Sequence, residues 1–157
     1  RNKNKLIDFA LGDNGGEMIS CSDMHFSHME NLTKSTTGID MSDGWETKRR
    51  RGPGHDWAIL KLGSPCAIER VIVDTLHFKG NFPDTCSIEG CYAPEQTNES
   101  FLNDKIDWTE LLHKSKLTAN QESVFILNNN LSITHIRFNI YPDGGVSRLR
   151  ILGRPTS

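Results

Sequence analysis

Short runs of β-branched and aliphatic residues, separated by Gly, Pro, Asn and Asp, recur through most of this sequence. Such runs between turn-forming residues are typical of β-strands rather than of helices. In the run Thr134–Tyr141, apolar and polar residues alternate, so one face of that strand can be buried while the other faces water. The predicted strands are Glu17–Cys21, Trp57–Leu62, Ile68–Thr75, Thr85–Tyr92, Ser123–Leu127, Thr134–Tyr141 and Val146–Leu152. This number of short strands favours an all-β sandwich.

Two segments depart from the strand pattern. The stretch Met24–Leu32 places Met24, His28 and Leu32 along one face at i, i+4 spacing, and Ser22 or Asp23 can cap it, which predicts one short helix near the N-terminus. The stretch Ala93–Asp107 is polar and rich in turn-forming residues, and it is predicted to be a long surface connection.

Length and composition exclude several classes of protein. A chain of 157 residues is the size of one domain, so residues 1–157 are predicted to form a single core. Mean hydropathy is -0.49, and no apolar run approaches the roughly 20 residues of a membrane-spanning helix. The net charge of -2 lacks the overall positive field of a dedicated nucleic-acid-binding protein. We therefore expect neither a membrane nor a nucleic acid as a partner.

The cysteines and histidines do not form a recognisable metal or disulfide pattern. The four cysteines are widely and irregularly spaced, which predicts reduced thiols, and Cys86 and Cys91 are expected to be packing residues. His25 and His28 have the spacing of two ligands on a helix, but no third ligand accompanies them. Because the sequence also lacks GxGxxG, Walker A and GxSxG motifs, we expect no metal and no cofactor.

Chemically versatile residues gather at three junctions between predicted strands, and the first is the densest. It reads DGWETKRRRGPGHDW and spans Asp43–Trp57. An Arg guanidinium can donate two parallel hydrogen bonds to a carboxylate, so Arg49 and Arg50 are candidates for binding an anion. Glu46 supplies a carboxylate beside them. The alternative is a solvated basic turn without a ligand.

The second junction reads DTLHFKGNFPD and spans Asp74–Asp84, directly after a predicted core strand. Asp74, His77, Lys79 and Asn81 can supply a base, hydrogen-bond donors and a second charge there. The alternative for His77 is a structural histidine held by hydrogen bonds.

The third junction reads YPDGGVSRLRILG and spans Tyr141–Gly153. Asp-Gly-Gly between two strands predicts a hairpin turn, so Asp143 either stabilises that turn or contributes to a site. Arg148 and Arg150 share one face of the following strand, where they can clamp an anion or pair with neighbouring acids. The apolar residues of this strand lack a strict period of two, which predicts a bulge or a later start near Ser147.

Together with CSDMHFSHMENL near the N-terminus, these three junctions resemble the allantoicase family in order and approximate spacing, over nearly the whole chain. The resemblance implies a jelly-roll β-sandwich of the galactose-binding-like type. It further implies that the chain is the second of two tandem repeats, that its first repeat is missing here, and that the protein forms a homo-oligomer. We expect a cytoplasmic location, with the peroxisome as the alternative.

The resemblance also implies a reaction, the hydrolysis of allantoate to ureidoglycolate and urea. That substrate needs a cationic anchor for its carboxylate, hydrogen-bond partners for two ureido groups, and groups that move protons. Expected catalytic residues are Glu46, Asp74 and His77. Expected substrate-binding residues are Arg49, Arg50, Lys79, Asn81, Asp143 and Arg148. Lys48 stands where family members often have Arg, which argues against bidentate binding at that position. The alternative function is a noncatalytic binding or scaffold domain.

Overall fold

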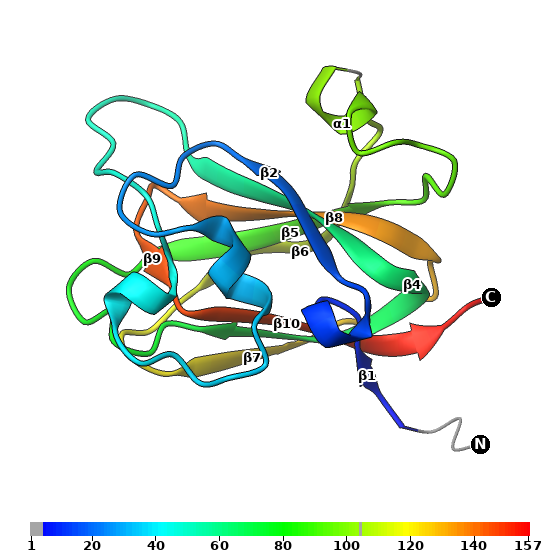
Figure 1. The fold of residues 1–157 in the computed structure, drawn as a ribbon, viewed down its shortest axis with the longest axis horizontal. Coiled ribbons are helices and arrows are strands. Elements are labelled where there is room, and N and C mark those ends of the chain that lie inside the picture. The colour runs from blue at the N-terminus through cyan, green and yellow to red at the C-terminus, as the bar shows by residue number, and fades with distance from the viewer. Residues whose placement is uncertain (1–4, 104) are drawn as a thin grey trace.

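One long bent strand, β4 (Asp56–Asp74), belongs to both layers of a β-sandwich and organises the fold (Figure 1). The structure is a computed structural model that describes residues 5–103 and 105–157. The first part of β4 pairs with β2 (Glu17–Cys21) and β8 (Ile133–Tyr141). Its second part pairs with β10 (Arg148–Pro155) and β7 (Glu122–Ile126). All of these pairings are antiparallel, so the predicted all-β sandwich is confirmed.

The remaining strands extend these two layers or form a small separate ribbon. β5 (Thr85–Cys91) pairs with β8, and β6 (Thr109–Lys116) pairs with β5. β1 (Ile7–Asp8) extends the other layer at the edge of β10. The other elements are β3 (Trp45–Glu46), β9 (Gly145–Val146), the 3-10 helices η1 (Gly12–Asn14), η2 (Met29–Thr33) and η3 (Met41–Asp43), and the α-helix α1 (Ser100–Asn103).

The strand predictions are largely confirmed, with several differences; the two-residue strands β1 and β3 were not predicted. The predicted strands Trp57–Leu62 and Ile68–Thr75 are one strand, because the chain bends between Lys61 and Cys66 without leaving the sheet. The third predicted junction breaks at Ser147 into β9 and β10, as its irregular period indicated. β6 was not predicted: it is an edge strand, mostly exposed or half-buried, and its sequence lacks the apolar alternation of a core strand.

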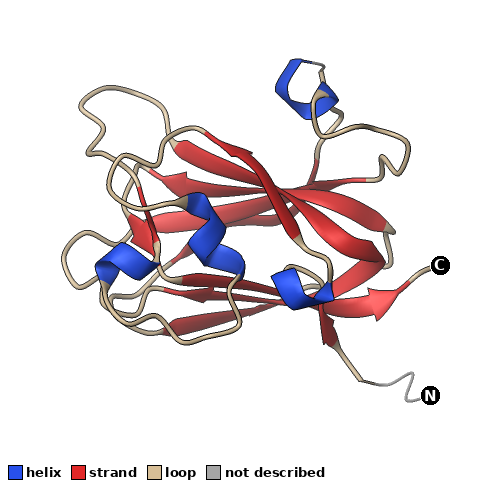
Figure 2. Cartoon of the chain, in the orientation of Figure 1, coloured by secondary structure: helices blue, strands red, loops and turns tan. Residues whose placement is uncertain are grey.

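The helical segments are short and lie outside the strands, with η1, η2 and η3 along one side of the sandwich and α1 projecting from its top in the view of Figure 2. The predicted helix near the N-terminus exists as η2, but it begins at Met29, and His28 rather than Ser22 or Asp23 caps it. Ser27 instead forms a β-bridge with Glu46, and the residues from Ser22 to Phe26 are bends and irregular backbone rather than helix. The predicted connection at 93–107 includes the single turn of α1. Among the described residues, no helix is both long and apolar enough to cross a bilayer.

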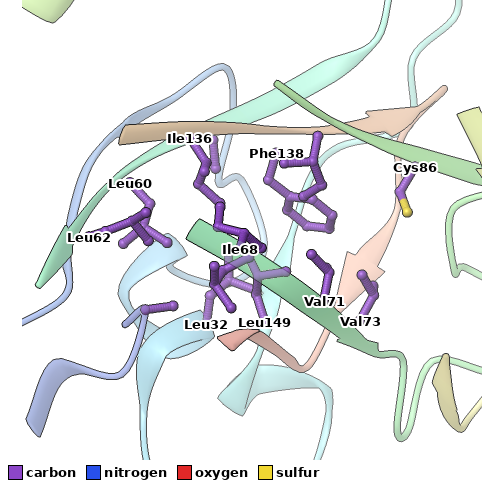
Figure 3. Packing of buried hydrophobic residues seen from close by; sticks show 14 of the residues in the cluster. Leu32, Leu60, Leu62, Ile68, Val71, Val73, Cys86, Ile136, Phe138 and Leu149 are labelled. Carbon is purple, nitrogen blue, oxygen red and sulfur yellow. The ribbon is translucent and has the colours of Figure 1, made fainter. Parts of the chain in front are cut away.

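The hydrophobic core fills the space between the two layers (Figure 3). Ile136 and Phe138 of β8 face Val71 of β4 and Leu149 of β10, and all four are at most 1% exposed. Burying one such side chain stabilises the fold by about 1.5–3 kcal/mol. The alternation in the sequence therefore correctly identified the inward-facing residues of β8. The expectation that the opposite face meets water is wrong, because His135 and Asn139 on that face are 1% and 2% exposed.

The cysteines belong to the packing of the fold. All four are free, as predicted, and Cys66, Cys86 and Cys91 are buried. Burial raises the pKa of Cys66 and Cys86 to about 12 and that of Cys91 to about 11, because the thiolate would lose its hydration. These thiols are therefore unsuited to act as nucleophiles.

Candidate functional site

A two-stranded ribbon brings the first and third junctions together. Trp45 of β3 pairs with Val146 of β9, and Glu46 pairs with Gly145. Trp45 is fully buried and its Nε1 donates a hydrogen bond to the carbonyl of Asp23 at 2.8 Å, so it anchors the ribbon to the sandwich. A Cβ at Gly145 would overlap the Phe78 ring, so glycine is required for this close approach.

Glu46 lines a cavity of about 550 Å³ beside this ribbon. Its Oε2 accepts a hydrogen bond from Asn81 Nδ2 at 2.6 Å, and its Oε1 has no hydrogen-bond partner among the described residues. Arg49 is exposed at the same cavity, and within the described part of the chain its side chain has no hydrogen-bond or ion-pair partner. The cavity lining consists of Phe26, Glu46, Thr47, Arg49, Arg50, Gly80, Asn81, Pro142, Asp143 and Gly144. A carboxylate, an amide and a guanidinium from two junctions thus share one cavity.

Arg50 is held in place by two carboxylates. Its Nη2 donates to Asp56 Oδ1 at 2.8 Å and to the carbonyl of His55 at 3.2 Å. Its backbone N–H donates to Asp143 Oδ2 at 2.8 Å. The hairpin predicted at Asp-Gly-Gly is wrong, because β9 pairs with β3 and β10 pairs with β4, and neither pairs with β8. Asp143 instead fastens the turn between β8 and β9 to the basic loop and lines the cavity.

A second hollow of about 710 Å³ lies on the other side of the basic loop. Arg49, Arg50 and Phe26 line both hollows, so they form a shared wall. The lining of this second hollow consists of Ser22, Asp23, Phe26, Lys48, Arg49, Arg50, Arg51, Gly52, Pro53 and Asp56. The basic run is therefore placed beside two concave surfaces, one of which also holds Glu46 and Asn81.

The other candidates from the second junction lie outside both hollows. Asp74 Oδ1 accepts a hydrogen bond from the backbone of Leu76 at 3.0 Å, which stabilises the turn after β4. His77 Nε2 lies 2.8 Å from the carbonyl oxygen of Gly38, and its backbone N–H donates to Asn120 Oδ1 at 2.7 Å. Lys79 is exposed. Among the residues of this junction expected to act in catalysis or binding, the structure brings Asn81 to the cavity.

Arg148 is also outside both hollows, because it is buried in the fold with 1% of its surface exposed. Its Nη2 pairs with Asp43 Oδ2 at 2.9 Å, and its Nε donates to the carbonyl of Thr36 at 2.7 Å. The hydrogen bond from Lys34, with the contribution of Arg148, lowers the pKa of Asp43 to about 2. Arg148 therefore fastens the segment between η2 and β3 to the sheet.

Arg150 does not form an anion clamp with Arg148. Its Nη1 donates to the carbonyl of Lys34 at 2.5 Å, and it lies 3.9 Å from Asp8 Oδ2. The two arginines thus meet protein acceptors, which was the alternative stated for this strand.

Several residues that line the hollows were not predicted as site residues, among them Asp23, Phe26 and Asp56. Asp23 was considered only as a helix cap, but its Oδ2 accepts hydrogen bonds from the backbone N–H groups of Lys48, at 2.7 Å, and His25. The contact between Asp23 and Lys48 joins segments far apart in the sequence, so no local pattern indicated it. Asp56 lies at the end of the first junction, and the high density of polar residues there is the signal that could have identified it as a site residue.

The histidine pair His25 and His28 does not share a helix, since η2 begins after His28. Within residues 5–103 and 105–157, no three His, Cys, Asp or Glu side chains are grouped in a way that could hold a metal ion.

The fold and the sequence agree in their similarity to known proteins. The family model for the allantoicase repeat matches residues 7–156. A probable allantoicase of Pseudomonas fluorescens strain Pf0-1 is 51% identical over 153 residues, covering 96% of this chain and 46% of that protein. The chain thus spans about half the length of the curated relatives it matches.

Comparison with solved structures also shows similarity to an allantoicase. The crystal structure of allantoicase from Saccharomyces cerevisiae superimposes with a TM-score of 0.83 at 41% identity, over 94% of this chain and 43% of that one. A chitosan-binding module of a chitosanase/glucanase from Paenibacillus superimposes with a TM-score of 0.66 at 12% identity, over 94% of this chain and 99% of that module, which shows a shared fold. The sandwich is therefore a jelly roll of the galactose-binding-like type. Since the repeat model spans nearly all of the chain and the cavity residues lie within that match, the chain belongs to the allantoicase family.

Proposed function

We propose that this chain contributes an active site that hydrolyses allantoate to ureidoglycolate and urea. The observation that carries the proposal is the meeting of Glu46, Asn81 and Arg49 at one cavity, with one Glu46 oxygen and the Arg49 guanidinium free of partners among the described residues. Membership of the allantoicase family supplies the substrate class.

The three side chains match the chemical needs of allantoate. Arg49 can donate two parallel hydrogen bonds to the substrate carboxylate. In the reaction the bond from the central carbon to one ureido nitrogen breaks and a bond to a water oxygen forms. A proton must reach the departing urea nitrogen and another must leave the water. In this proposal Glu46 moves one of these protons, and the hydrogen bond from Asn81 supports that role by fixing the orientation of the carboxylate.

Replacing Glu46 with Gln tests this role, because the amide keeps the size of the side chain but cannot carry the proton. In the full-length protein we expect urea release from allantoate to fall at least about 100-fold, the usual scale for losing a general acid or base. Glu110→Gln, on the exposed edge strand β6, is the matched control and should leave the rate unchanged.

Two results would contradict the proposal. Undiminished urea release in Glu46→Gln would remove Glu46 from the reaction. Allantoate binding by the wild-type protein without any urea release would support the alternative of a noncatalytic binding domain instead.

We also propose that the complete protein holds a first repeat in addition to this one, forms a homo-oligomer and resides in the cytoplasm. The support for the first repeat is that this chain covers 46% of its Pseudomonas relative. Chromatography of the full-length protein with light-scattering detection tests the oligomer, and a single subunit mass in solution would contradict it.

A further inference from the structure

The second hollow repeats an arrangement found in the first. In the first, Glu46 has one oxygen occupied by Asn81 and the other without a partner among the described residues. In the second, Asp23 Oδ2 accepts the backbone N–H groups of Lys48 and His25, and Asp23 Oδ1 has no partner in the part of the chain that the structure describes. Each hollow therefore offers a half-buried carboxylate that is fixed through one oxygen and can accept a hydrogen bond at the other.

Arg49 lines both hollows, and no protein acceptor among the described residues engages its side chain. A ligand whose carboxylate binds Arg49 can therefore carry one group into the hollow lined by Glu46 and another into the hollow lined by Asp23. Phe26 is 62% exposed and also lines both hollows, so it can cover apolar parts of such a ligand.

A second observation marks the second hollow as built for polar contacts. Asp56 lines it and is 1% exposed, yet its Oδ2 is buried without a hydrogen-bond partner, while its Oδ1 accepts from Arg50 and Ser22. Uncompensated burial of a carboxylate oxygen is costly, so the wall of this hollow contains an unsatisfied polar group to which a buried water could donate. Lys48 and Arg51 add donors at the same hollow.

The arrangement matches a molecule with one carboxylate between two ureido groups on a single carbon. Ureido groups carry N–H donors that suit a carboxylate and a carbonyl that suits a cationic donor. We propose that the second hollow binds the ureido group of allantoate that is not removed, with Asp23 accepting its N–H. This inference rests on the proposed function, in which Glu46 moves a proton while the other ureido group leaves as urea. Asp23 is then a residue that determines specificity for a substrate with two ureido groups.

The test compares allantoate with N-carbamoylglycine, which has the same carboxylate and only one ureido group. In the full-length protein, the KM for allantoate and the inhibition constant of N-carbamoylglycine are measured for wild type, Asp23→Asn and Asp13→Asn. Asn retains an oxygen for the backbone N–H groups and loses the charge, and Asp13 is an exposed residue that lines neither hollow. We expect Asp23→Asn to raise the KM for allantoate about tenfold, the scale of one charge-assisted hydrogen bond, and to leave the inhibition constant of N-carbamoylglycine unchanged.

The possible outcomes separate this inference from the proposed function. If Asp23→Asn weakens both ligands equally, Asp23 acts by shaping the basic loop and the inference is overturned. If it weakens neither, or if Asp13→Asn has the same effect, the inference is also overturned while the proposed function stands. If wild-type protein releases no urea from allantoate, the proposed function fails and the inference fails with it.

Discussion

Two neighbouring regions contain the same types of residue but use them in opposite ways. At the cavity beside β3, Arg49 and one oxygen of Glu46 lack partners among the residues the structure describes. At the corner where β10 begins, Arg148 is buried and its guanidinium bonds to Asp43 and to the carbonyls of Thr36 and Ser147. In the first region these side chains can still hydrogen-bond to a ligand, whereas in the second the same kinds of side chain are bonded to other groups of the protein.

The difference shows that residue type is a weak guide to function when the partners are unknown. An arginine next to a carboxylate reads the same in a sequence whether the pair is available to substrate or locked in the structure. Burial and partner geometry decide between the two, because a buried charge must be paired within the protein while an exposed one can bind a ligand. The predictions below test this contrast.

Removing Arg148 should have the largest effect on stability. Arg148→Met leaves the Asp43 carboxylate without one of its two cationic partners and leaves carbonyls of the 34–43 segment unpaired. Breaking a buried pair in this way costs about 3–5 kcal/mol of unfolding free energy. Urea denaturation measures the loss, and Arg51→Met at an exposed position should stay within about 0.5 kcal/mol of wild type. Equal losses in the two variants would erase the contrast between the regions.

Removing Arg49 should have the opposite effects, with little change in the free energy of unfolding and a higher KM for allantoate. Arg49→Ala takes away a side chain without protein partners in the described structure, so the unfolding free energy should change by less than about 0.5 kcal/mol. The KM for allantoate in the full-length protein should rise about 10- to 100-fold, because a charge-assisted contact to the carboxylate is lost. Arg49→Lys should recover only part of this, since an ammonium cannot make the two parallel bonds. An unchanged KM in Arg49→Ala would place the carboxylate elsewhere.

His77 should affect stability modestly and catalysis little. Its ring nitrogen meets the Gly38 carbonyl, and it lines neither hollow. His77→Ala is expected to cost about 1 kcal/mol, the typical net value of one hydrogen bond, with kcat/KM for allantoate unchanged. A large fall in kcat at unchanged stability would restore His77 to the catalytic residues predicted from the sequence.

The free energy of unfolding should depend on pH in different ranges for two titratable groups, Asp43 beside Arg148 and His135 in β8. Asp43 has its pKa lowered from 3.8 to about 2, so its contribution is complete above pH 4 and is lost as the pH falls toward 2. Burial lowers the pKa of His135 from 6.5 to about 4, so the unfolded chain binds its proton first and stability declines as the pH falls from 6.5 toward 4. Stability curves of Asp43→Asn should flatten below pH 4, and those of His135→Gln between pH 4 and 6.5. Unchanged slopes would contradict these assignments.

The strands show which features of the fold can be predicted from a local sequence pattern. Alternation identified β8, and the irregular period after Val146 indicated the break at Ser147, because both depend on neighbours in the sequence. The continuity of β4 could not be predicted, since Gly63 and Pro65 look like a turn until β10 and β8 pair on either side of the bend. The pattern also predicted a helix from Met24, whereas the bridge between Ser27 and Glu46 delays the helical turn until Met29.

The candidate site divides in the same way. Of the expected site residues, Glu46, Arg49, Arg50, Asn81 and Asp143 line one cavity, and Asp74, His77, Lys79 and Arg148 do not. The sequence shows that all of these expected site residues cluster at three junctions between predicted strands. The contacts that occupy His77 and Arg148, with Gly38 and with Thr36, join residues far apart along the chain. No local signal distinguishes such residues from free ones.

The sequence by itself determined the class of fold and the residues from which a site can be built, because strand periodicity and turn chemistry are local properties. Tertiary structure alone decided which of those residues remain free. The pairing of β3 with β9 placed Glu46 and Arg49 beside open space, while the close packing of the 34–43 segment against β10 buried Arg148 with Asp43. Hydrogen-bonding capacity left for a ligand is what remains after the fold has satisfied its own buried polar groups.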